Sequence, residues 1–200
     1  MTSVARLDAE QGRPDCSKGD DAELARTRSS FLIVPGLNDS DAGHWQTRWQ
    51  RDYGLPRVVQ PQWNVPDIDV WAQTLERYVG VFASPVVLLA HSFGCLTTAF
   101  AAARLRNRIA AALLVAPPDP NKFGIAARLP ASCLPFPSIM VGSRNDPWMD
   151  IDWAQWWAGS WGSVFIDIGA AGHINTASGF GEWPRGWELA QVLALQQKLQ

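Results

Sequence analysis

The chain has 200 residues, and its 17 Lys and Arg against 19 Asp and Glu give a formal net charge of -2 at pH 7. This length predicts one domain or at most two, and the charge balance provides no basic field of the kind that attracts nucleic acid. No apolar run approaches the roughly 18 residues that a membrane-spanning helix needs, so we expect neither a nucleic-acid nor a membrane partner.

The first 29 residues are polar and mixed in charge, without a sustained apolar period. They also lack an uninterrupted apolar core of signal-peptide length. We therefore expect residues 1–29 to form a poorly ordered N-terminal tail and residues 30–200 to form a single domain with a sizeable core.

The three cysteines are Cys16, Cys95 and Cys133, which form neither a C-x-x-C motif nor a cluster of metal ligands. We therefore expect no metal site. Because the sequence shows no export signal, a reducing cytoplasm is the expected compartment.

Strand-like and helix-like segments alternate along the rest of the chain, beginning with a buried strand at residues 31–35. Trp45 and Trp49 stand four apart, on one face of a predicted helix. A short strand is expected at residues 57–60. A helical apolar spacing follows in residues 67–82, where Asp67 or Asp69 would cap the helix start.

The second half opens on a continuous apolar run at residues 85–90, as in a central parallel strand. The elements expected after it are an alanine-rich helix at 93–105, strands at 109–117, 138–142 and 164–169, and helices at 150–159 and 183–200. No hairpin signal separates the strands. The alternation therefore predicts a three-layer α/β fold with a mainly parallel sheet of about six strands.

Three reactive residues stand just after predicted strands, in the order Ser92, Asp146, His173. Ligands of parallel α/β sheets bind at the carboxyl ends of the strands, so these side chains are expected at one edge. A serine hydroxyl needs a base to accept its proton, and the base needs a partner that orients it. The order is that of the α/β-hydrolases and differs from the orders of the chymotrypsin and subtilisin types.

Ser92 lies in the stretch AHSFG, where a sharp strand-to-helix turn would lift its Oγ above the sheet. Gly94 supplies the small residue after the serine, but Ala90 stands where the G-x-S-x-G motif has glycine. The alternative role for Ser92 is to cap the helix that follows. The ordered partners at other strand ends favour a nucleophile.

Of the three histidines, His173 is predicted to be the base, because Gly172 before it frees a loop past the last strand. His91 precedes Ser92, but adjacent residues of a strand point to opposite faces. A packed or hydrogen-bonded structural role is therefore expected for His91. His44 opens a helix, where it would cap or pack, or lie near the pocket.

Asp146 is predicted to orient His173, and Pro147 favours an extended backbone at Asp146. The alternative role for Asp146 is to cap the helix that starts near Trp148. Other acids fit the orienting role less well: Asp150 and Asp152 fall within the predicted helix, Asp167 within the last strand, and Glu182 after the histidine.

Two backbone N–H groups are expected to bind the oxyanion of a reacting carbonyl. One is that of Phe93, after the nucleophile, and the other is that of Leu37, in the loop after the first strand. Asn38 is the second choice in this loop. The alternative for residues 35–40 is a plain turn with Asn38 or Ser40 as a helix cap.

Several stretches together resemble the retinoblastoma-binding-protein-9-like group of the α/β-hydrolase superfamily: VPGLNDSDAGHWQTRW, LLAHSFGCL, SRNDPW and GHINTASGFGEWPRG. The resemblance covers the chain from about residue 31 to its C-terminus. It implies an α/β-hydrolase domain without a large lid, a triad of Ser92, Asp146 and His173, no metal and no organic cofactor. It also implies hydrolysis of small esters or amides. The chain has no L-x-C-x-E motif, so the resemblance implies no protein partner.

The predicted function is therefore cleavage of a small ester or amide through an acyl-enzyme on Ser92, as in a carboxylesterase. The alternatives are a non-catalytic binding protein on the same scaffold, and a peptidase or C–C hydrolase that uses the same triad. Asn38, Trp45 and Trp148 are expected in the substrate pocket. Core packing is the alternative for these tryptophans and for two further pocket candidates, Trp63 and Trp183.

Overall fold

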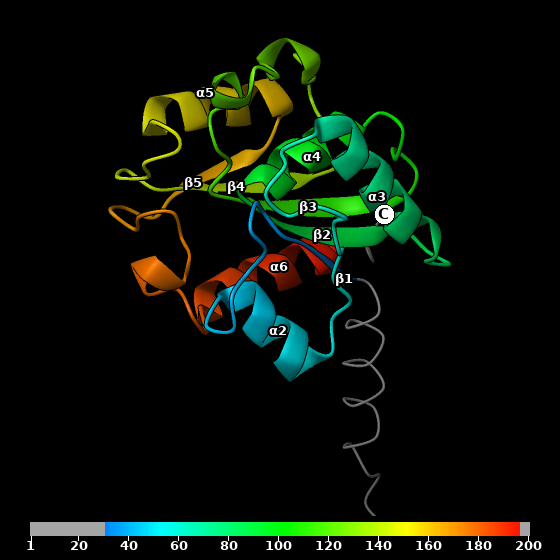
Figure 1. The fold of residues 1–200 in the computed structure, drawn as a ribbon, viewed down its shortest axis with the longest axis horizontal. Helices are drawn as coiled ribbons and strands as arrows, with labels where there is room; N and C mark the ends of the chain where they lie inside the picture. Colours follow the sequence, from blue (N-terminus) through cyan, green and yellow to red (C-terminus); the bar gives the residue numbers. More distant parts are fainter. Residues whose placement is uncertain (1–30, 197–200) are drawn as a thin grey trace, which may run out of the picture.

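The computed structural model describes residues 31–196, which form an α/β fold around one parallel sheet (Figure 1). The predicted tail at residues 1–29 lies outside the described residues. The sheet has five strands in the order β1-β2-β3-β4-β5. Their bounds are β1 Phe31–Val34, β2 Val86–His91, β3 Ile109–Val115, β4 Ser138–Gly142 and β5 Val164–Asp167. Neighbouring strands run parallel throughout, so all five carboxyl ends meet at one edge.

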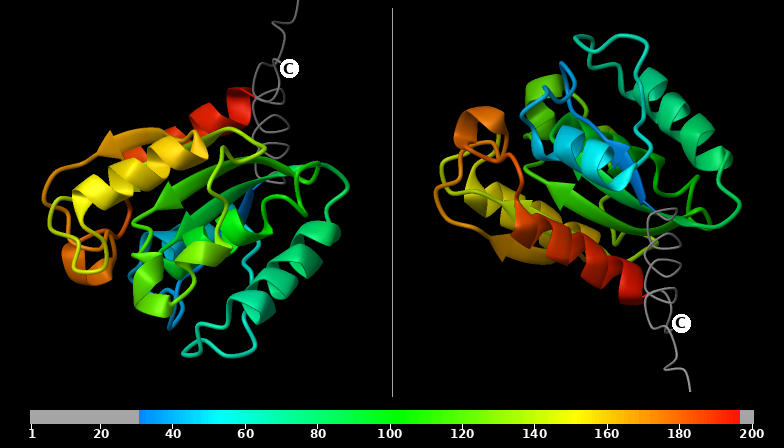
Figure 2. Two further views of the ribbon diagram at one scale, coloured as in Figure 1. Left: turned by 90° about the horizontal axis from the view of Figure 1, so that it is seen from above. Right: turned by 90° about the horizontal axis from the view of Figure 1, so that it is seen from below.

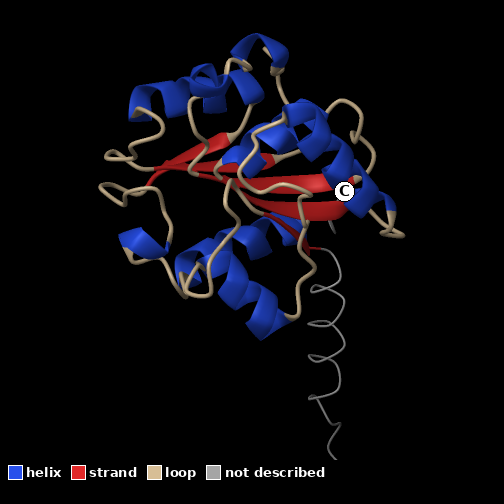
Figure 3. Cartoon of the chain, in the orientation of Figure 1, coloured by secondary structure: helices blue, strands red, loops and turns tan. Residues whose placement is uncertain are grey.

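Helices cover both faces of this sheet, which lies as a red layer between blue helices in Figure 3. One face carries α2 (Trp45–Tyr53) and α6 (Pro184–Gln196), and the other carries α3 (Ile68–Gly80), α4 (Phe93–Ala101) and α5 (Ile151–Trp161). The views from above and below in Figure 2 show the same division. The three-layer α/β architecture predicted from the alternating segments is confirmed.

The strand β2 contributes side chains to the hydrophobic cores on both faces of the sheet, against which the helices pack. Every residue of β2 is buried, as its continuous apolar run predicts for a central parallel strand. Leu88 and Ala90 face one core, and Val87 and Leu89 face the other, following the two-residue period of a strand. Helix residues complete the two cores: Trp71, Leu75, Leu96 and Trp157 on the first face, and Trp45, Trp49, Ala190 and Leu193 on the second.

The strand expected at residues 57–60 forms only one isolated bridge, between Arg57 and Ile33 of β1. The Ile33 N–H donates to the Pro56 carbonyl, and the Val58 N–H donates to the Ile33 carbonyl, both at 2.9 Å. Proline has no N–H to extend such a ladder, and Pro56 and Pro61 stand at either end of the segment. This segment therefore lies along β1 without becoming a sixth strand.

The helix expected at residues 93–105 ends at Ala101, four residues early. Turns follow, in which the N–H groups of Arg104 and Leu105 both donate to the Ala101 carbonyl. The Leu105 side chain is buried, and its carbonyl accepts from the N–H groups of Arg108 and Ile109. The chain thereby reverses into β3, so packing overrides the helical propensity of this alanine-rich stretch.

Within residues 31–196, no helix is both long and apolar enough to cross a membrane. The same residues contain no group of three or more His, Cys, Asp or Glu side chains that could hold a metal ion. The cytoplasmic location and the lack of a cofactor stay predictions.

Candidate active site

Ser92 stands at the turn between β2 and α4, with a φ of 52° and a ψ of −127°. A positive φ in a non-glycine residue costs about 1–3 kcal/mol and persists only where the surroundings hold it. Here the Ser92 N–H donates to the carbonyl of Val115 in β3 at 2.9 Å. The Oγ makes no capping bond to α4, and it lies 2.9 Å from Nε2 of His173. The side chain thus projects from the sheet edge toward His173 and does not serve as a helix cap.

Two glycines permit this tight turn. A Cβ on Gly36 would stand 2.6 Å from the Cβ of Ser92, which is closer than real side chains approach. A Cβ on Gly94 would collide with the carbonyl oxygens of Val34 and Pro35, the latter at 2.6 Å. Glycine therefore lets the loop after β1 and the first turn of α4 pack directly against each other.

Ala90 occupies the position of the first glycine in G-x-S-x-G. Its side chain is fully buried in the core beneath α3 and α4. The turn at Ser92 therefore forms with a methyl group at this position.

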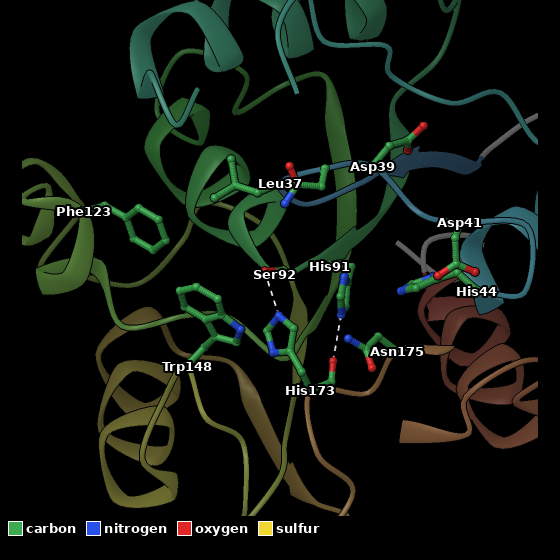
Figure 4. A pocket seen from close by; sticks show the side chains of 11 residues that line it. Leu37, Asp39, Asp41, His44, His91, Ser92, Phe123, Trp148, His173 and Asn175 are labelled. Carbon is green, nitrogen blue, oxygen red and sulfur yellow. Dashed lines mark hydrogen bonds between the residues drawn. The ribbon is translucent and has the colours of Figure 1, made fainter. Parts of the chain in front are cut away.

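His173 lies between Ser92 and Asp146 (Figure 4). Its Nδ1 is 2.9 and 3.0 Å from the two carboxylate oxygens of Asp146. A carboxylate only accepts hydrogen bonds, so Nδ1 carries the proton of the neutral ring and Nε2 can accept the proton of the Ser92 hydroxyl. The Asp146 and His173 side chains are only 3% and 11% exposed, and water therefore competes little for this pair. The arrangement can accept a proton from Ser92 and stabilise the resulting imidazolium ion.

The Asp146 side chain also makes a bond of the kind expected from a helix cap. Its Oδ1 accepts from the N–H of Trp148 at 2.9 Å, in addition to its contact with His173. The helix itself begins later, and its N-cap is Asp150, whose carboxylate accepts from the N–H of Asp152. Asp167 binds Arg144 and the N–H of Gly169 instead of a histidine.

A set of bonds that the sequence analysis missed ties the Asp146 loop to the His173 loop. The Ser143 hydroxyl accepts from the N–H of Ala171 at 2.9 Å, and Oδ1 of Asn145 accepts from the N–H of Gly172 at 2.7 Å. Ser143 also donates to Asn145 at 3.0 Å. These bonds fix the distance between the two loops that carry the acid and the imidazole.

His91 lies beside the imidazole of His173 and does not contact Ser92 through a hydrogen bond. Its Nε2 is 2.9 Å from the backbone carbonyl oxygen of His173, and the two rings have centroids 5.0 Å apart. Burial, with smaller contributions from His44 and His173, lowers the pKa of His91 well below its ordinary value. His91 is therefore a neutral, hydrogen-bonded structural histidine. This is the role expected from its position next to Ser92 on the strand.

His44 does both things expected of it. It is the N-cap of α2, where its Nδ1 accepts from the N–H of Gln46 at 3.1 Å. It also lines the cavity in front of Ser92. Burial lowers the pKa of His44 to about 4, so the ring is neutral at physiological pH.

The backbone N–H groups of Leu37 and Phe93, near Ser92, have no acceptor within residues 31–196. The N–H of Asn38, the second choice from the sequence, donates to the carbonyl of Trp63 at 2.8 Å. It is therefore unavailable to a substrate. The geometry thus favours Leu37 over Asn38 in the loop after β1.

A cavity of about 240 Å³ opens in front of Ser92 and His173. Leu37, Asn38 and Trp148 line it, as expected. Its other lining residues are Asp39, Asp41, His44, His91, Phe123 and Asn175. The sequence does not indicate Phe123 or Asn175, because Phe123 ends a short 3-10 helix (Pro120–Phe123) and Asn175 lies in a distant loop, and neither follows a periodic pattern.

The prediction that Trp45 lines the pocket is wrong. Its side chain is fully buried, and its Nε1 donates to the carbonyl of Ile174 at 3.0 Å. It packs edge-on against Trp49 and Trp183, in the core beneath the sheet. Trp63 and Trp183 also pack against the cores and do not border the cavity.

Comparison with known proteins assigns the chain to a family. The family model for serine hydrolases matches residues 31–192. Among solved structures, the chain is similar to a protein of Pectobacterium atrosepticum described as a YdeN-like hydrolase, with 38% sequence identity and a TM-score of 0.80 over 90% of this chain and 98% of that one. No curated protein matches the chain.

Two more distant structures are similar in fold alone. The ydeN gene product of B. subtilis is 19% identical, with a TM-score of 0.67 over 82% of this chain and 97% of that one. Est1E of Butyrivibrio proteoclasticus, solved with ferulic acid bound, is 13% identical, with a TM-score of 0.60 over 85% of this chain and 89% of that one. The family model and the Pectobacterium structure carry the assignment: the chain belongs to the serine hydrolase family.

Proposed function

We propose that the protein cleaves a small ester or amide through an acyl-enzyme on Ser92, with His173 as the base and Asp146 as the residue that orients it. The observation that carries this proposal is the unbroken series of hydrogen bonds from Ser92 Oγ through the His173 ring to Asp146. Ser92 and His173 both line the cavity, where a substrate carbonyl carbon can reach the Oγ.

In the first step, Ser92 Oγ attacks the carbonyl carbon while Nε2 of His173 takes the hydroxyl proton. The carbonyl π electrons move to the oxygen, and the N–H groups of Leu37 and Phe93 stabilise the oxyanion. Each such donor is worth roughly 2.7–4 kcal/mol in kcat. As the tetrahedral intermediate collapses, the bond to the leaving group breaks, and His173 returns the proton to the departing alcohol or amine.

In the second step, water attacks the acyl-enzyme carbonyl and gives its proton to His173. Collapse of the second intermediate breaks the bond to Ser92 Oγ, which recovers the proton from the imidazolium ion. The products are a carboxylic acid and the free enzyme. Asp146 keeps the Nδ1 proton in place through both steps.

An ester is the preferred substrate class within this proposal, as in a carboxylesterase. An alcohol leaves more readily than an amine, which must be protonated as the C–N bond breaks. The half-exposed Trp148 and the small cavity fit a small-molecule substrate. Within the family, we propose membership of the retinoblastoma-binding-protein-9-like group, which is supported by the motifs of the sequence.

A series of 4-nitrophenyl esters from acetate to octanoate, run beside aminoacyl 4-nitroanilides, tests this function. We expect ester turnover that is lost in Ser92→Ala. Turnover of the anilides alone would favour a peptidase. No turnover of either class by the folded protein would favour the binding-protein alternative.

A further inference from the structure

The two sides of the cavity differ in chemistry (Figure 4). Phe123 and Trp148 lie on one side of the Ser92–His173 hydrogen bond, and Asn175 and His44 lie on the other. A substrate whose carbonyl reaches Ser92 therefore places its two halves in different surroundings.

The aromatic side is a wall of two nearly parallel rings. The ring centroids of Phe123 and Trp148 are 6.4 Å apart, with an angle of 17° between the planes. Phe93 supports Phe123 edge-on at 5.0 Å, and Trp148 lies 6.1 Å from the His173 ring. Lys122 Nζ lies 5.5 Å from the centre of the Trp148 ring, and the residue is still 43% exposed. Part of its apolar surface is therefore available to an apolar or aromatic group of the substrate.

Asn175 presents a hydrogen-bond donor on the opposite side. Its Oδ1 accepts from the N–H and the hydroxyl of Ser178, at 3.1 and 3.0 Å. A backbone N–H only donates, so this contact fixes which end of the amide is oxygen. The Nδ2 group then faces the cavity, and it has no acceptor among the described residues.

His44 lies behind Asn175, and its ring carries a further donor that the protein encloses. Its Nδ1 accepts from Gln46, so the proton of the neutral ring is on Nε2. Nε2 is buried and has no hydrogen-bond partner within residues 31–196. The residue is 3% exposed and borders the cavity. Because Nε2 is enclosed by the protein, the donor that a substrate oxygen can reach on this side of the cavity is Nδ2 of Asn175.

Asp41 restricts what this acceptor can be. It borders the cavity on the same side, and a hydrogen bond from Thr176 lowers the pKa of its carboxyl. The carboxylate is therefore ionised at neutral pH and repels an anionic group. An uncharged acceptor oxygen fits both the Asn175 donor and this charge.

We propose that the site selects esters in which the scissile carbonyl separates an apolar, preferably aromatic, group from a group with an uncharged acceptor oxygen, and that Asn175 is the specificity-determining residue for that oxygen. The aromatic half packs on Phe123 and Trp148, and the oxygen accepts from Nδ2 of Asn175. This inference rests on the proposed function, because it assumes that Ser92 attacks the carbonyl between the two halves.

Two pairs of isosteric esters test the inference in both orientations of the substrate. The first pair is 2-methoxyethyl phenylacetate and butyl phenylacetate, and the second is benzyl methoxyacetate and benzyl butanoate. Each pair exchanges one ether oxygen for a methylene group. The ratio of kcat/KM within a pair is divided by the ratio of the hydroxide-catalysed rates, which removes the difference in intrinsic reactivity.

For wild type, we expect at least one pair to favour the ether by about tenfold after this correction, which is the effect of one hydrogen bond of roughly 1.4 kcal/mol. Asn175→Asp is the matched variant, because its Oδ1 still accepts from Ser178 while the NH₂ donor becomes an oxygen. In this variant we expect the preference to disappear. Trp148→Ala should leave the ether preference in place. It should lower kcat/KM for the two phenylacetates relative to the corresponding acetates, which lack the aromatic ring.

A corrected ratio near one in both pairs for wild type would overturn the inference without the need for any variant. An ether preference that persists in Asn175→Asp, in protein that still reacts with a fluorophosphonate, would overturn the role of Asn175. Failure of the proposed function is a different result: wild type would then hydrolyse none of the four esters and would not react with the fluorophosphonate at Ser92.

Discussion

The Nε2 atom of His91 lies 2.9 Å from the backbone carbonyl oxygen of His173. A carbonyl only accepts, so the His91 ring donates this hydrogen bond. His91 therefore holds the loop of the proposed base, while the base itself, His173, lies 81 positions after Ser92 in the chain. Since His91 is buried and neutral, it adds no positive charge beside the imidazolium ion that forms during the reaction.

Asp146 and Asp150 form a matched pair of acids on one loop. Asp146→Asn should lower kcat by roughly 10³–10⁴, because an amide in place of the carboxylate favours the wrong tautomer of His173. Asp150→Asn should retain wild-type kcat, because Asn caps a helix about as well as Asp. Steady-state kinetics on one ester measures both. Equal losses in the two variants would contradict the assignment of Asp146.

The buried histidines make stability depend on pH. His44 and His91 have lowered pKa values in the folded protein, to about 4 for His44, against about 6.5 in the unfolded chain. Below pH 6.5 the unfolded chain binds protons that the folded protein does not. The stabilising contribution is therefore complete above pH 6.5 and is lost as the pH falls toward 4, at up to about 1.4 kcal/mol per pH unit for each histidine.

Urea unfolding between pH 7 and pH 5 measures this slope. The His44→Asn variant keeps a residue that can cap α2 and removes one titrating group, so its free energy of unfolding should fall less steeply with decreasing pH. A wild-type free energy of unfolding that is flat or rises on acidification across this window would show that these rings are not buried as neutral groups.

Gly94 and Gly159 are both helical glycines, with opposite surroundings. Gly94→Ala should destabilise the protein by several kcal/mol and abolish activity, because the new Cβ meets backbone oxygens of the loop after β1. In Gly159→Ala, in α5, the new Cβ meets no atom within 4 Å apart from its own stretch of helix backbone, and the change should stabilise the protein by about 0.5–1 kcal/mol. Thermal unfolding with an activity assay distinguishes the two. A stable, active Gly94→Ala would contradict the close packing at Ser92.

Ala90→Gly restores the G-x-S-x-G pattern and should bring no gain. It removes a fully buried methyl group and loosens the backbone of a central strand, at a cost of about 1–2 kcal/mol. We expect a lower Tm with kcat/KM unchanged at temperatures well below it. A large rise in kcat/KM would mean that the alanine distorts the turn at Ser92.

Much of the fold follows from local patterns. The apolar run of β2 and the spacing of Trp45 and Trp49 are periodic signals, and the structure has a strand and a helix at these places. The meeting of Ser92, Asp146 and His173 was predictable as well, since each follows a strand of one parallel sheet. The segment at residues 57–60 was not, because its apolar residues lie between prolines that end the pairing.

The finer parts of the candidate site depend on contacts between distant loops. The bonds from Ser143 and Asn145 to the His173 loop join residues about 28 apart, and no spacing in the sequence marks them. Trp45 was misplaced for a different reason. A tryptophan can pack in a core or line a pocket, and the sequence around it looks the same in both cases. Only the packing of α2 against Trp183 decides between these places.

The central claim is that Ser92 is the nucleophile, and labelling with a fluorophosphonate probe tests it most directly. Ser163→Ala is the matched control, because Ser163 lies just before β5, at the other end of the sheet, and its hydroxyl is hydrogen-bonded to the Ser138 hydroxyl. We predict that wild type and Ser163→Ala form the covalent adduct at equal rates, with the added mass on the peptide that contains Ser92, and that Ser92→Ala forms none. Equal labelling of Ser92→Ala and wild type would contradict the claim.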